Sequence, residues 1–521
     1  MSDRLINGWG GLCVGIVLLA GLAPSAASAA EARDDLTWRD YDAAAFATAQ
    51  QDNKFILLDL VAVWCHWCHV MDRTTYRDPA VQALIEAHFV PVKADHDARP
   101  DLAERYRDWG WPATIVLAPD GTEIVKRAGY IAPESMARLL QAIVDDPSPE
   151  AGQLGQLTAP SASPELSADI GATLRRRHVT AYDTARGGLN IAQKFIDADS
   201  IDYALQRAQA GDAREAQRVR QTLDAGLALI DPAFGGAYQY STHFDWQHPH
   251  YEKIMRTQWA YLRSYSRACT QLNEPRYCQA AAAVADYLND FLSAPGGAFY
   301  SSQDADLRQG EKGHAYFALG REARLALGLP RIDKHRYAST NGMAIEGLAE
   351  LYEATGDTAY LYRALTATWW VVANRSLWSG GFRHDKVDHA GPYLADTLWM
   401  GRAFAALYRV TGDRDFLRRA QRAAEFIAAQ FRHDVVGLRS AVSNGTPVEP
   451  LPQIDQNIQA VRFLLALNAM APNPQWVDLA AVGLRFLVTP EVALSRASDP
   501  GILIAAEGYR LAVAQAQAAG R

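Results

Sequence analysis

The chain has 521 residues, 49% of them apolar, which is enough for two or three domains with a large core. Its formal charge is −8, and no basic cluster interrupts the sequence. This charge balance argues against nucleic acid as a partner.

Residues 1–29 have the pattern of a secretory signal peptide. An apolar run from Leu12 to Ala23 precedes an A-x-A cleavage pattern that ends at Ala29. The run is short for a membrane span, and no later stretch is long and apolar enough to be one. We therefore expect an exported, periplasmic protein with no membrane span after signal cleavage, and no lipid anchor at Cys13.

Signal removal leaves an even number of cysteines, which suits an oxidising compartment. They are Cys65, Cys68, Cys269 and Cys278. The second pair flanks a turn between two helical runs, and this predicts a structural disulfide. Two unrelated buried thiols are the alternative.

Residues 30–147 carry the pattern of an α/β domain. The apolar run at 55–63 leads into Cys65-x-x-Cys68, and helical spacing follows from 70 to 88 despite Pro79. A strand that ends in C-x-x-C and leads into a helix is the thioredoxin arrangement. A cysteine at the helix N-terminus would have a stabilised thiolate, and the second, one turn on, would close a disulfide with it.

The resemblance to thioredoxins implies roles for three more residues. Asp59 stands where thioredoxins keep a buried acid that relays the proton of the second cysteine. Lys93, on the next apolar strand, resembles the usual partner of that acid. Pro112, after Trp111, resembles the cis-proline that faces the disulfide and accepts substrate backbone.

Other readings of the same motif stay open. Cys65, Cys68 and His69 spell the c-type haem attachment motif, although such motifs do not usually follow a buried strand carrying an acid. A metal site made of both cysteines with His66 and His69 would crowd its ligands into one helical turn, with no second ligand pair. An inert disulfide is the third reading. We expect no metal and no cofactor.

Residues 148–165 are rich in Pro, Gly, Ser and Ala and indicate a linker. From 166 to 521 the chain is mostly helical and repeats itself: LYEATGDTAYL, from Leu351, returns as LYRVTGDRDFL, from Leu407. Glycine-rich loops occur between the copies. The pattern predicts helical hairpins, and six of them would close an (α/α)6 barrel; an open solenoid is the alternative.

Several motifs together resemble the YyaL/spermatogenesis-associated protein family. They are CHWCHVM at 65–71, KADHDARPD at 93–101, GWPATIVLAPDG at 110–121, the stretch 231–255 with W-x-x-P-H-Y-E-K, and GGAFYSSQDAD at 296–306. The resemblance implies a multidomain protein in which a thioredoxin-like α/β domain precedes an all-α six-hairpin barrel. The family's barrel resembles those of sugar epimerases and glycoside hydrolases.

The densest polar and aromatic stretch of the barrel is 245–253, and we expect it to line a small-molecule pocket. Glu252 paired with Asp304 would suit glycoside hydrolysis, and His248 or His250 would suit proton abstraction in an epimerase. Helix capping and loop bracing are the alternative. The expected substrate-binding residues are Trp246, His250, Glu252, Lys253, Gln303 and Asp304. Further polar candidates are Lys194, Asp245, Asp306, Asn341, Asp396, Asp455 and Asn457.

Two function hypotheses follow. The first is an exported thiol–disulfide oxidoreductase that uses Cys65 and Cys68, with a barrel that binds a protein client or a small molecule. The second is a carbohydrate-active barrel, which acts on a sugar and carries the thioredoxin-like domain as an accessory. The thiol site has the more complete set of residues, so we favour the first.

Overall fold

A computed structural model describes residues 36–150, 159–388, 390–433 and 435–519. The predicted signal peptide, Cys13 and the middle of the predicted linker lie outside the described residues. Over the rest, residues from Leu36 onwards belong to one unit.

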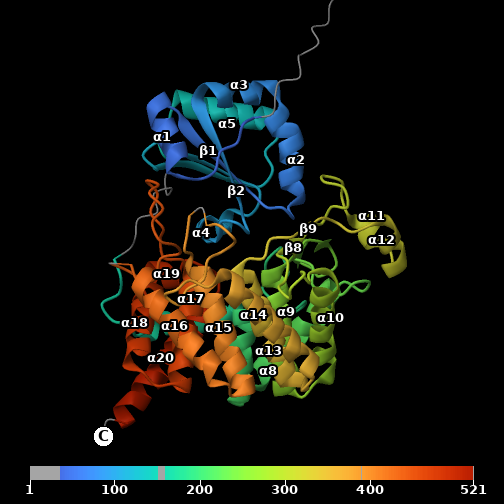
Figure 1. Cartoon of the computed structure of the whole chain (residues 1–521), viewed down its shortest axis with the longest axis vertical. Helices are drawn as coiled ribbons and strands as arrows, with labels where there is room; N and C mark the ends of the chain where they lie inside the picture. The colour runs from blue at the N-terminus through green and yellow to red at the C-terminus, as the bar shows by residue number, and fades with distance from the viewer. Residues whose placement is uncertain (1–35, 151–158, 389, 434, 520–521) are drawn as a thin grey trace, which may run out of the picture. The chain divides into compact units, whose positions relative to one another are not determined.

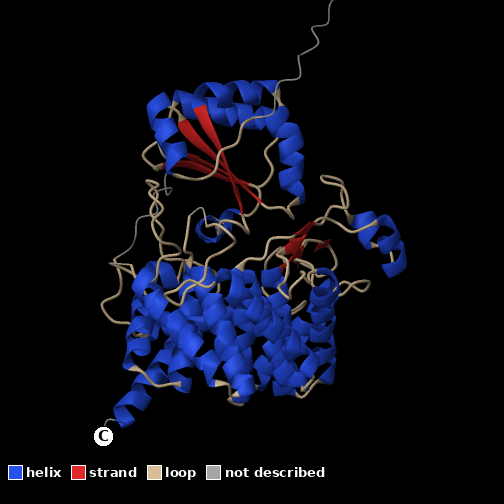
Figure 2. Ribbon diagram, in the orientation of Figure 1, coloured by secondary structure: helices blue, strands red, loops and turns tan. Residues whose placement is uncertain are grey.

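The N-terminal part of that unit contains a mixed sheet with strand order β2-β1-β3-β4 (Figure 2). Strands β1 (Phe55–Val61) and β2 (Phe89–Asp95) are parallel, whereas β3 (Ala113–Leu117) and β4 (Glu123–Ala128) are antiparallel to their neighbours. This is the sheet of a thioredoxin-like domain, as the sequence predicted.

The alternation of β1 explains how both faces of the sheet are buried. Ile56, Leu58 and Leu60 pack in one core cluster with Phe46, whereas Leu57 packs in another with residues of the opposite helices. Successive strand side chains point to opposite faces, so an unbroken apolar run indicates a strand covered on both sides. The covering helices are α1 (Ala43–Asp52), α2 (His66–Thr74), α3 (Pro79–His88), α4 (Pro100–Arg105) and α5 (Pro133–Asp145).

The helical stretch predicted after the cysteines is two helices with a break. Helix α2 ends at Thr74, a turn of 3₁₀-helix follows as η1 (Thr75–Arg77), and α3 begins at Pro79. The side chain of Asp78 accepts from the backbone N–H groups of Ala80 and Val81, which makes it the N-cap of α3. Proline fits the first position of a helix because its missing N–H has no partner there.

The C-terminal part consists of helical hairpins that stand side by side (Figure 1). Six inner helices each contact the next in the ring, and the last contacts the first, so within the described residues the open-solenoid alternative is wrong. The inner helices are α7 (Ala198–Gln209), α9 (Met255–Leu272), α13 (Ala338–Thr355), α15 (Leu394–Thr411), α17 (Ile454–Met470) and α20 (Pro500–Ala519).

Each inner helix has an outer partner. These are α8 (Ala213–Gly226), α10 (Pro275–Phe291), α14 (Thr358–Arg375), α16 (Arg414–Gln430), α18 (Pro474–Leu487) and, beside α20, α6 (Ala168–Thr180). The first helix of this part therefore pairs with the last, which closes the (α/α)6 barrel.

The repeated T-G-D turns join inner helices to outer ones. Gly356 and Gly412 end α13 and α15 in the left-handed region, with φ of 71° and 70°. The aspartates that follow them, Asp357 and Asp413, cap the N-termini of α14 and α16 through their side chains. Each motif thus ends one helix and starts the next, which explains its recurrence.

The corresponding turn between α9 and α10 carries a disulfide. Asn273 takes the left-handed place of the glycine, with φ of 54°. Cys269 and Cys278 are joined across this turn. The predicted disulfide therefore links the two helices of one hairpin of the ring.

The remaining elements lie in the loops of the barrel. They include the hairpin of β5 (Tyr240–Ser241) and β6 (Pro249–His250), and a small sheet of β7 (Lys253–Ile254), β8 (Ser302–Gln303) and β9 (Ile332–Asp333). The short helices are η2 (Arg107–Trp109) in the thioredoxin-like part, then η3 (Leu227–Leu229), α11 (His314–Phe317), α12 (Arg321–Leu327) and α19 (Pro490–Ala493).

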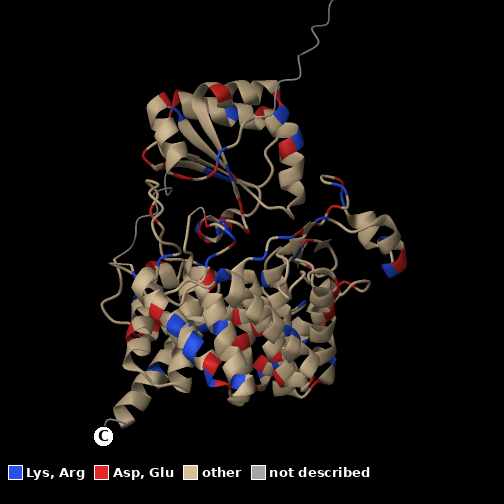
Figure 3. Cartoon of the chain, in the orientation of Figure 1, with Lys and Arg blue, Asp and Glu red and all other residues tan. Residues whose placement is uncertain are grey.

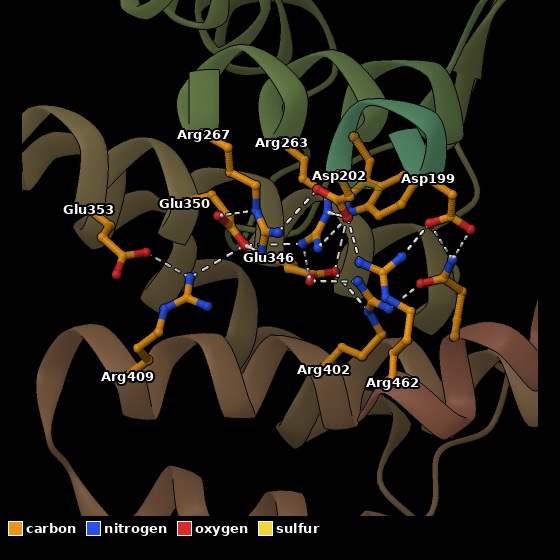
Figure 4. A network of polar contacts seen from close by, with 12 residues as sticks. Asp199, Asp202, Arg263, Arg267, Glu346, Glu350, Glu353, Arg402, Arg409 and Arg462 are labelled. Atoms are coloured by element: carbon orange, nitrogen blue, oxygen red, sulfur yellow. Dashed lines mark hydrogen bonds and ion pairs between the residues drawn. The ribbon is translucent and has the colours of Figure 1, made fainter. Parts of the chain in front are cut away.

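A buried network of charges links the inner helices (Figure 4). Asp202 of α7 accepts from Arg263 of α9 at 2.9 Å, and Glu346 of α13 accepts from Arg402 of α15 at 2.8 Å. Arg263 also reaches Glu346, at 3.1 Å, so the contacts run from helix to helix around the ring. Such a network costs desolvation energy and is tolerated because nearly every charge is paired.

Charges of both signs are interspersed along the helices of the barrel (Figure 3). No helix among the described residues is long and apolar enough to cross a membrane.

Candidate redox site and barrel cavity

Cys65 and Cys68 lie at the start of α2 and are bonded to each other. Cys65 is the N-cap, and its Sγ accepts from the backbone N–H of Cys68 at 3.1 Å. An N–H group aimed at this sulfur, together with the helix dipole, favours the thiolate once the disulfide is reduced. The disulfide leaves neither sulfur as a ligand for haem or metal in this state.

Asp59 lies on β1 and is 1% exposed. Neither of its carboxylate oxygens has a hydrogen-bond partner among the described residues. Burial raises the pKa of Asp59 to about 7, although Lys93 opposes the shift. An acid with this pKa suits a proton relay at neutral pH.

Lys93 stands close to Asp59, as the thioredoxin resemblance implies, but it has a second partner. Its Nζ lies 3.7 Å from Asp59 Oδ2 and donates to Asp72 Oδ1 at 2.5 Å. The ammonium also sits 4.4 Å from the centre of the Trp38 ring. Asp72 of α2 therefore competes for the charge of Lys93.

The Trp111–Pro112 peptide bond is cis. Trp111 packs against the imidazole of His96, at a ring distance of 4.5 Å, and against Trp64, at 6.5 Å. Trp64 and Trp111 pack in one cluster with the two cysteines, of which Cys65 is 3% and Cys68 2% exposed. The redox pair is reached through a cavity and not over an open surface.

That cavity has a volume of about 350 Å³ and is lined from both parts of the chain. The thioredoxin-like part contributes Trp64, Cys65, His66, Trp67, His96 and Trp111, among others. The barrel contributes Tyr240, His250, Glu252, Arg256, Met343 and Trp399, among others. A molecule held by the barrel here would meet the sulfur of Cys65.

A second cavity, of about 420 Å³, shares Tyr240, Arg256 and Trp399 with the first. First-turn residues of all six inner helices line one or other of the two cavities; they are Ala198, Arg256, Ser339, Ala395, Gln456 and Pro500. The disulfide therefore faces the N-terminal mouth of the barrel.

Two of the predicted substrate-binding residues line the first cavity. The ring of His250 stacks on Tyr240 at 4.3 Å, and its Nδ1 lies 3.8 Å from Glu252 Oε2. Glu252 is 4% exposed, and this oxygen has no hydrogen-bond partner in the described chain. An imidazole beside a carboxylate is a combination suited to acid–base chemistry.

Three other predicted substrate-binding residues have structural roles instead. Lys253 is fully buried, and its Nζ donates to Asp231 and to the carbonyl of Gly235, each at 2.7 Å. The indole N–H of Trp246 donates to the carbonyl of Arg186, and Gln303 accepts from Tyr287. These contacts brace the loops, although Gln303 Nε2 has no hydrogen-bond partner among the described residues.

Most further polar candidates also brace the barrel. Lys194 donates to Asp183, and Asp245 accepts from His248. Asn341 and Asn457 bond the backbone of the preceding glycine loops, Asp396 accepts from the N–H of Ser339, and Asp455 bonds Arg496. The capping alternative therefore describes these residues.

Asp304 and Asp306 follow β8 and meet the redox helix, a contact that sequence reasoning missed. Asp306 Oδ1 accepts from His66 Nδ1 at 2.8 Å, and His69 Nδ1 lies 3.7 Å from Asp304 Oδ2. Burial raises the pKa of Asp304 to about 7, whereas hydrogen bonds from His66 and His69 hold the pKa of Asp306 below its usual value. Residues far apart in the chain thus share one site.

Asp97 forms a second set of polar contacts with the barrel loops. Asp97 accepts from the indole of Trp64 at 3.2 Å and from the hydroxyls of Ser301 and Ser302 at 3.0 and 3.2 Å. Its carbonyl accepts from His384 at 2.7 Å. The KADHDARPD motif is therefore a contact between the redox domain and the barrel loops.

Comparisons with known proteins agree with this architecture. A family model described as "Protein of unknown function, DUF255", with the name Thioredox_DsbH, matches residues 23–145. Human spermatogenesis-associated protein 20 is 27% identical over 310 residues, which cover 53% of this chain and 39% of that protein. This chain thus aligns with about two fifths of that relative's length.

Two further similarities concern the separate parts. Thiol:disulfide interchange protein DsbD 1 of Pseudomonas aeruginosa is 39% identical over 83 residues, which are 15% of this chain and 14% of that protein. The crystal structure of a D-mannose isomerase is similar over 62% of this chain and 86% of its own, with 11% identity and a TM-score of 0.48.

Fold and site together define a thioredoxin-like domain with a C-x-x-C disulfide, joined to an (α/α)6 helical barrel. The chain is similar to the YyaL/spermatogenesis-associated protein family, as its sequence motifs indicated.

Proposed function

We propose that this protein is an exported thiol–disulfide oxidoreductase whose substrate is held at the mouth of the barrel. In the reductive direction, the Cys65 thiolate attacks the disulfide of the substrate, displaces one substrate thiolate and forms a mixed disulfide with the other sulfur. The Cys68 thiolate then attacks Cys65 Sγ, which releases the second substrate thiolate and leaves the Cys65–Cys68 bond. Two electrons pass to the substrate, and the oxidative direction is the reverse sequence.

One observation carries the proposal: the Cys65–Cys68 disulfide opens into a cavity that the barrel also lines. The N-cap position of Cys65 favours its thiolate, and Asp59 provides a nearby buried acid. The similarity to a protein named for thiol:disulfide interchange supports the same chemistry. The signal-peptide pattern and the paired cysteines support an oxidising location.

Cys68→Ser should trap a mixed disulfide on Cys65, whereas Cys65→Ser should trap none. The reason is that only Cys65 attacks the substrate, and without Cys68 the adduct has no resolving thiol. The measurement is non-reducing electrophoresis and mass spectrometry of tag-free protein isolated from the cell envelope. The double substitution Cys269→Ser/Cys278→Ser, which removes the other disulfide, should leave trapping by Cys68→Ser unaltered when the two are combined. Equal trapping by the two single variants would refute the assignment of Cys65 as nucleophile.

A carbohydrate-active barrel is the second candidate, favoured by His250 and Glu252 in the same cavity. The aromatic rings of Tyr240 and Trp399 line it as well, and rings of this kind suit the apolar face of a sugar. In this reading, the imidazole and the carboxylate exchange protons with a bound sugar.

Reducing mono- and disaccharides should then raise the melting temperature of the wild type, and His250→Ala and Glu252→Gln should abolish that rise. Both variants remove a polar group at the cavity and should leave reduction of the disulfide unchanged. His248→Ala is the control, because His248 bonds Asp245 and its side chain is 57% exposed. If no sugar in the panel raises the melting temperature of the wild type, the carbohydrate reading fails while the redox proposal stands.

A further inference from the structure

Three ligating side chains converge where the redox helix meets the barrel loop after β8. They are His69 on α2 and the carboxylates of Asp304 and Asp306. His69 Nδ1 lies 3.5 Å from Asp306 Oδ2 and 3.7 Å from Asp304 Oδ2, and one atom of each residue lies within 4.8 Å of the others. The helix and the loop therefore present a nitrogen and two oxygens to the same point.

The carboxylate of Asp304 is buried in this cluster and has one oxygen without a partner. Asp304 is 0% exposed, and its Oδ2 has no hydrogen-bond partner within the described residues. The 3.7 Å separation from His69 is too long for a hydrogen bond. It does suit two ligands of one ion, because ligands about 2.0–2.1 Å from a tetrahedral metal stand roughly 3.4 Å apart.

Neighbouring side chains add negative charge to the cluster and fix the orientation of one of its carboxylates. Glu252 and Asp304 adjoin the Lys253–Gln303 pair of the β7–β8 ladder, and Glu252 Oε2 also has no hydrogen-bond partner in the described part of the chain. His66 Nδ1 contacts both oxygens of Asp306, at 2.8 and 3.0 Å, and the N–H of Gly310 donates to Oδ2 at 2.6 Å, so this carboxylate is held in place. Groups that orient ligands in this way are typical of metal sites.

We propose that His69, Asp304 and Asp306 bind a divalent transition-metal ion beside the redox disulfide. One imidazole and two carboxylates suit Zn²⁺ or Mn²⁺, with water in the remaining positions. The ion would join α2, which carries Cys65 and Cys68, to the loop after β8. It would therefore hold the redox helix against the mouth of the barrel. This inference does not depend on the proposed redox function.

The sequence motif alone did not predict this site, because no second pair of ligands follows His66 and His69 nearby in the sequence. The barrel supplies Asp304 and Asp306, which lie more than two hundred positions later in the chain. This ligand set contains no cysteine, because Cys65 and Cys68 are bonded to each other and their sulfurs cannot bind a metal as thiolates.

Calorimetric titration of the tag-free, chelator-treated chain with Zn²⁺ alone and with Mn²⁺ alone tests the proposal. The cysteines are kept oxidised so that thiolates do not bind metal. We expect one ion per chain and a rise in melting temperature with at least one of the two metals. Asp304→Asn, which keeps the shape of the side chain, and His69→Ala should each weaken binding by more than about tenfold.

The control variant is His335→Ala, because His335 also pairs with an aspartate, Asp333, but its side chain is 54% exposed. It should bind the ion as the wild type does. Circular dichroism of each metal-free variant checks that it is folded, and Asp306→Asn provides a third ligand change should His69→Ala unfold. The proposal is overturned if neither metal binds saturably, or if the ion binds the folded ligand variants as tightly as the wild type.

Discussion

Asp59→Asn should remove a pH dependence of stability that the wild type shows between about pH 4 and pH 7. Burial raises the pKa of this carboxyl from 3.8 to about 7, so the folded chain holds a proton that the unfolded chain has released. Stability of the wild type therefore falls as the pH rises through this window, by up to about 4 kcal/mol. Asparagine does not titrate, so the free energy of unfolding of the variant should increase relative to that of the wild type as the pH rises.

Urea denaturation of the oxidised chain at pH 5 and at pH 8 measures the difference. The advantage of Asp59→Asn should be larger at pH 8. Asp120→Asn is the matched control, because Asp120 is exposed in the turn before β4 and its pKa is lowered by the N–H of Thr122. A variant advantage that is the same at both pH values would contradict a raised pKa of Asp59.

The sequence predicted the thioredoxin-like part well because its signals are local. The alternation of Ile56, Leu57 and Leu58 between two core clusters follows from the two-residue period of a strand. The position of Cys65 at a helix start follows from the strand before it and the helix after it. The break at Pro79 was visible too, but its consequence, a second helix capped by Asp78, required the cap geometry.

The barrel was predicted through its turns and through resemblance. Gly356 and Asp357 show how one motif ends a helix and begins the next. Closure of the ring depends on contacts between α20 and α7, which are almost three hundred residues apart. Local periodicity carries no signal for such a contact, so the solenoid alternative stayed open until the structure was available.

The site residues divide according to where their partners lie. The density of polar residues at 245–253 predicted a pocket, and His250 and Glu252 line a cavity in the structure. The same density did not distinguish a charge that faces a ligand from one that is paired within the protein. Lys253 is paired with Asp231, and that partner comes from a separate loop. The contact of His66 with Asp306 joins the two domains, so neither domain's motif predicts it.

Asp202→Asn should destabilise the protein by about 3–5 kcal/mol, because it breaks a buried ion network without changing its shape. The carboxylate is 1% exposed and bonds Arg263, Arg267 and Arg462, from α9 and α17. These arginines hold the pKa of Asp202 far below its usual value, so the contribution of this carboxylate to the free energy of unfolding is fully present above about pH 4.

The loss of stability in Asp202→Asn, measured by urea denaturation, should therefore be equal at pH 5 and pH 8, unlike the effect at Asp59. Glu353→Gln is the control, because this half-exposed side chain contributes one ion pair, to Arg409, and should cost less than about 1 kcal/mol. Equal stability of the two variants would show that the network does not hold the inner helices together.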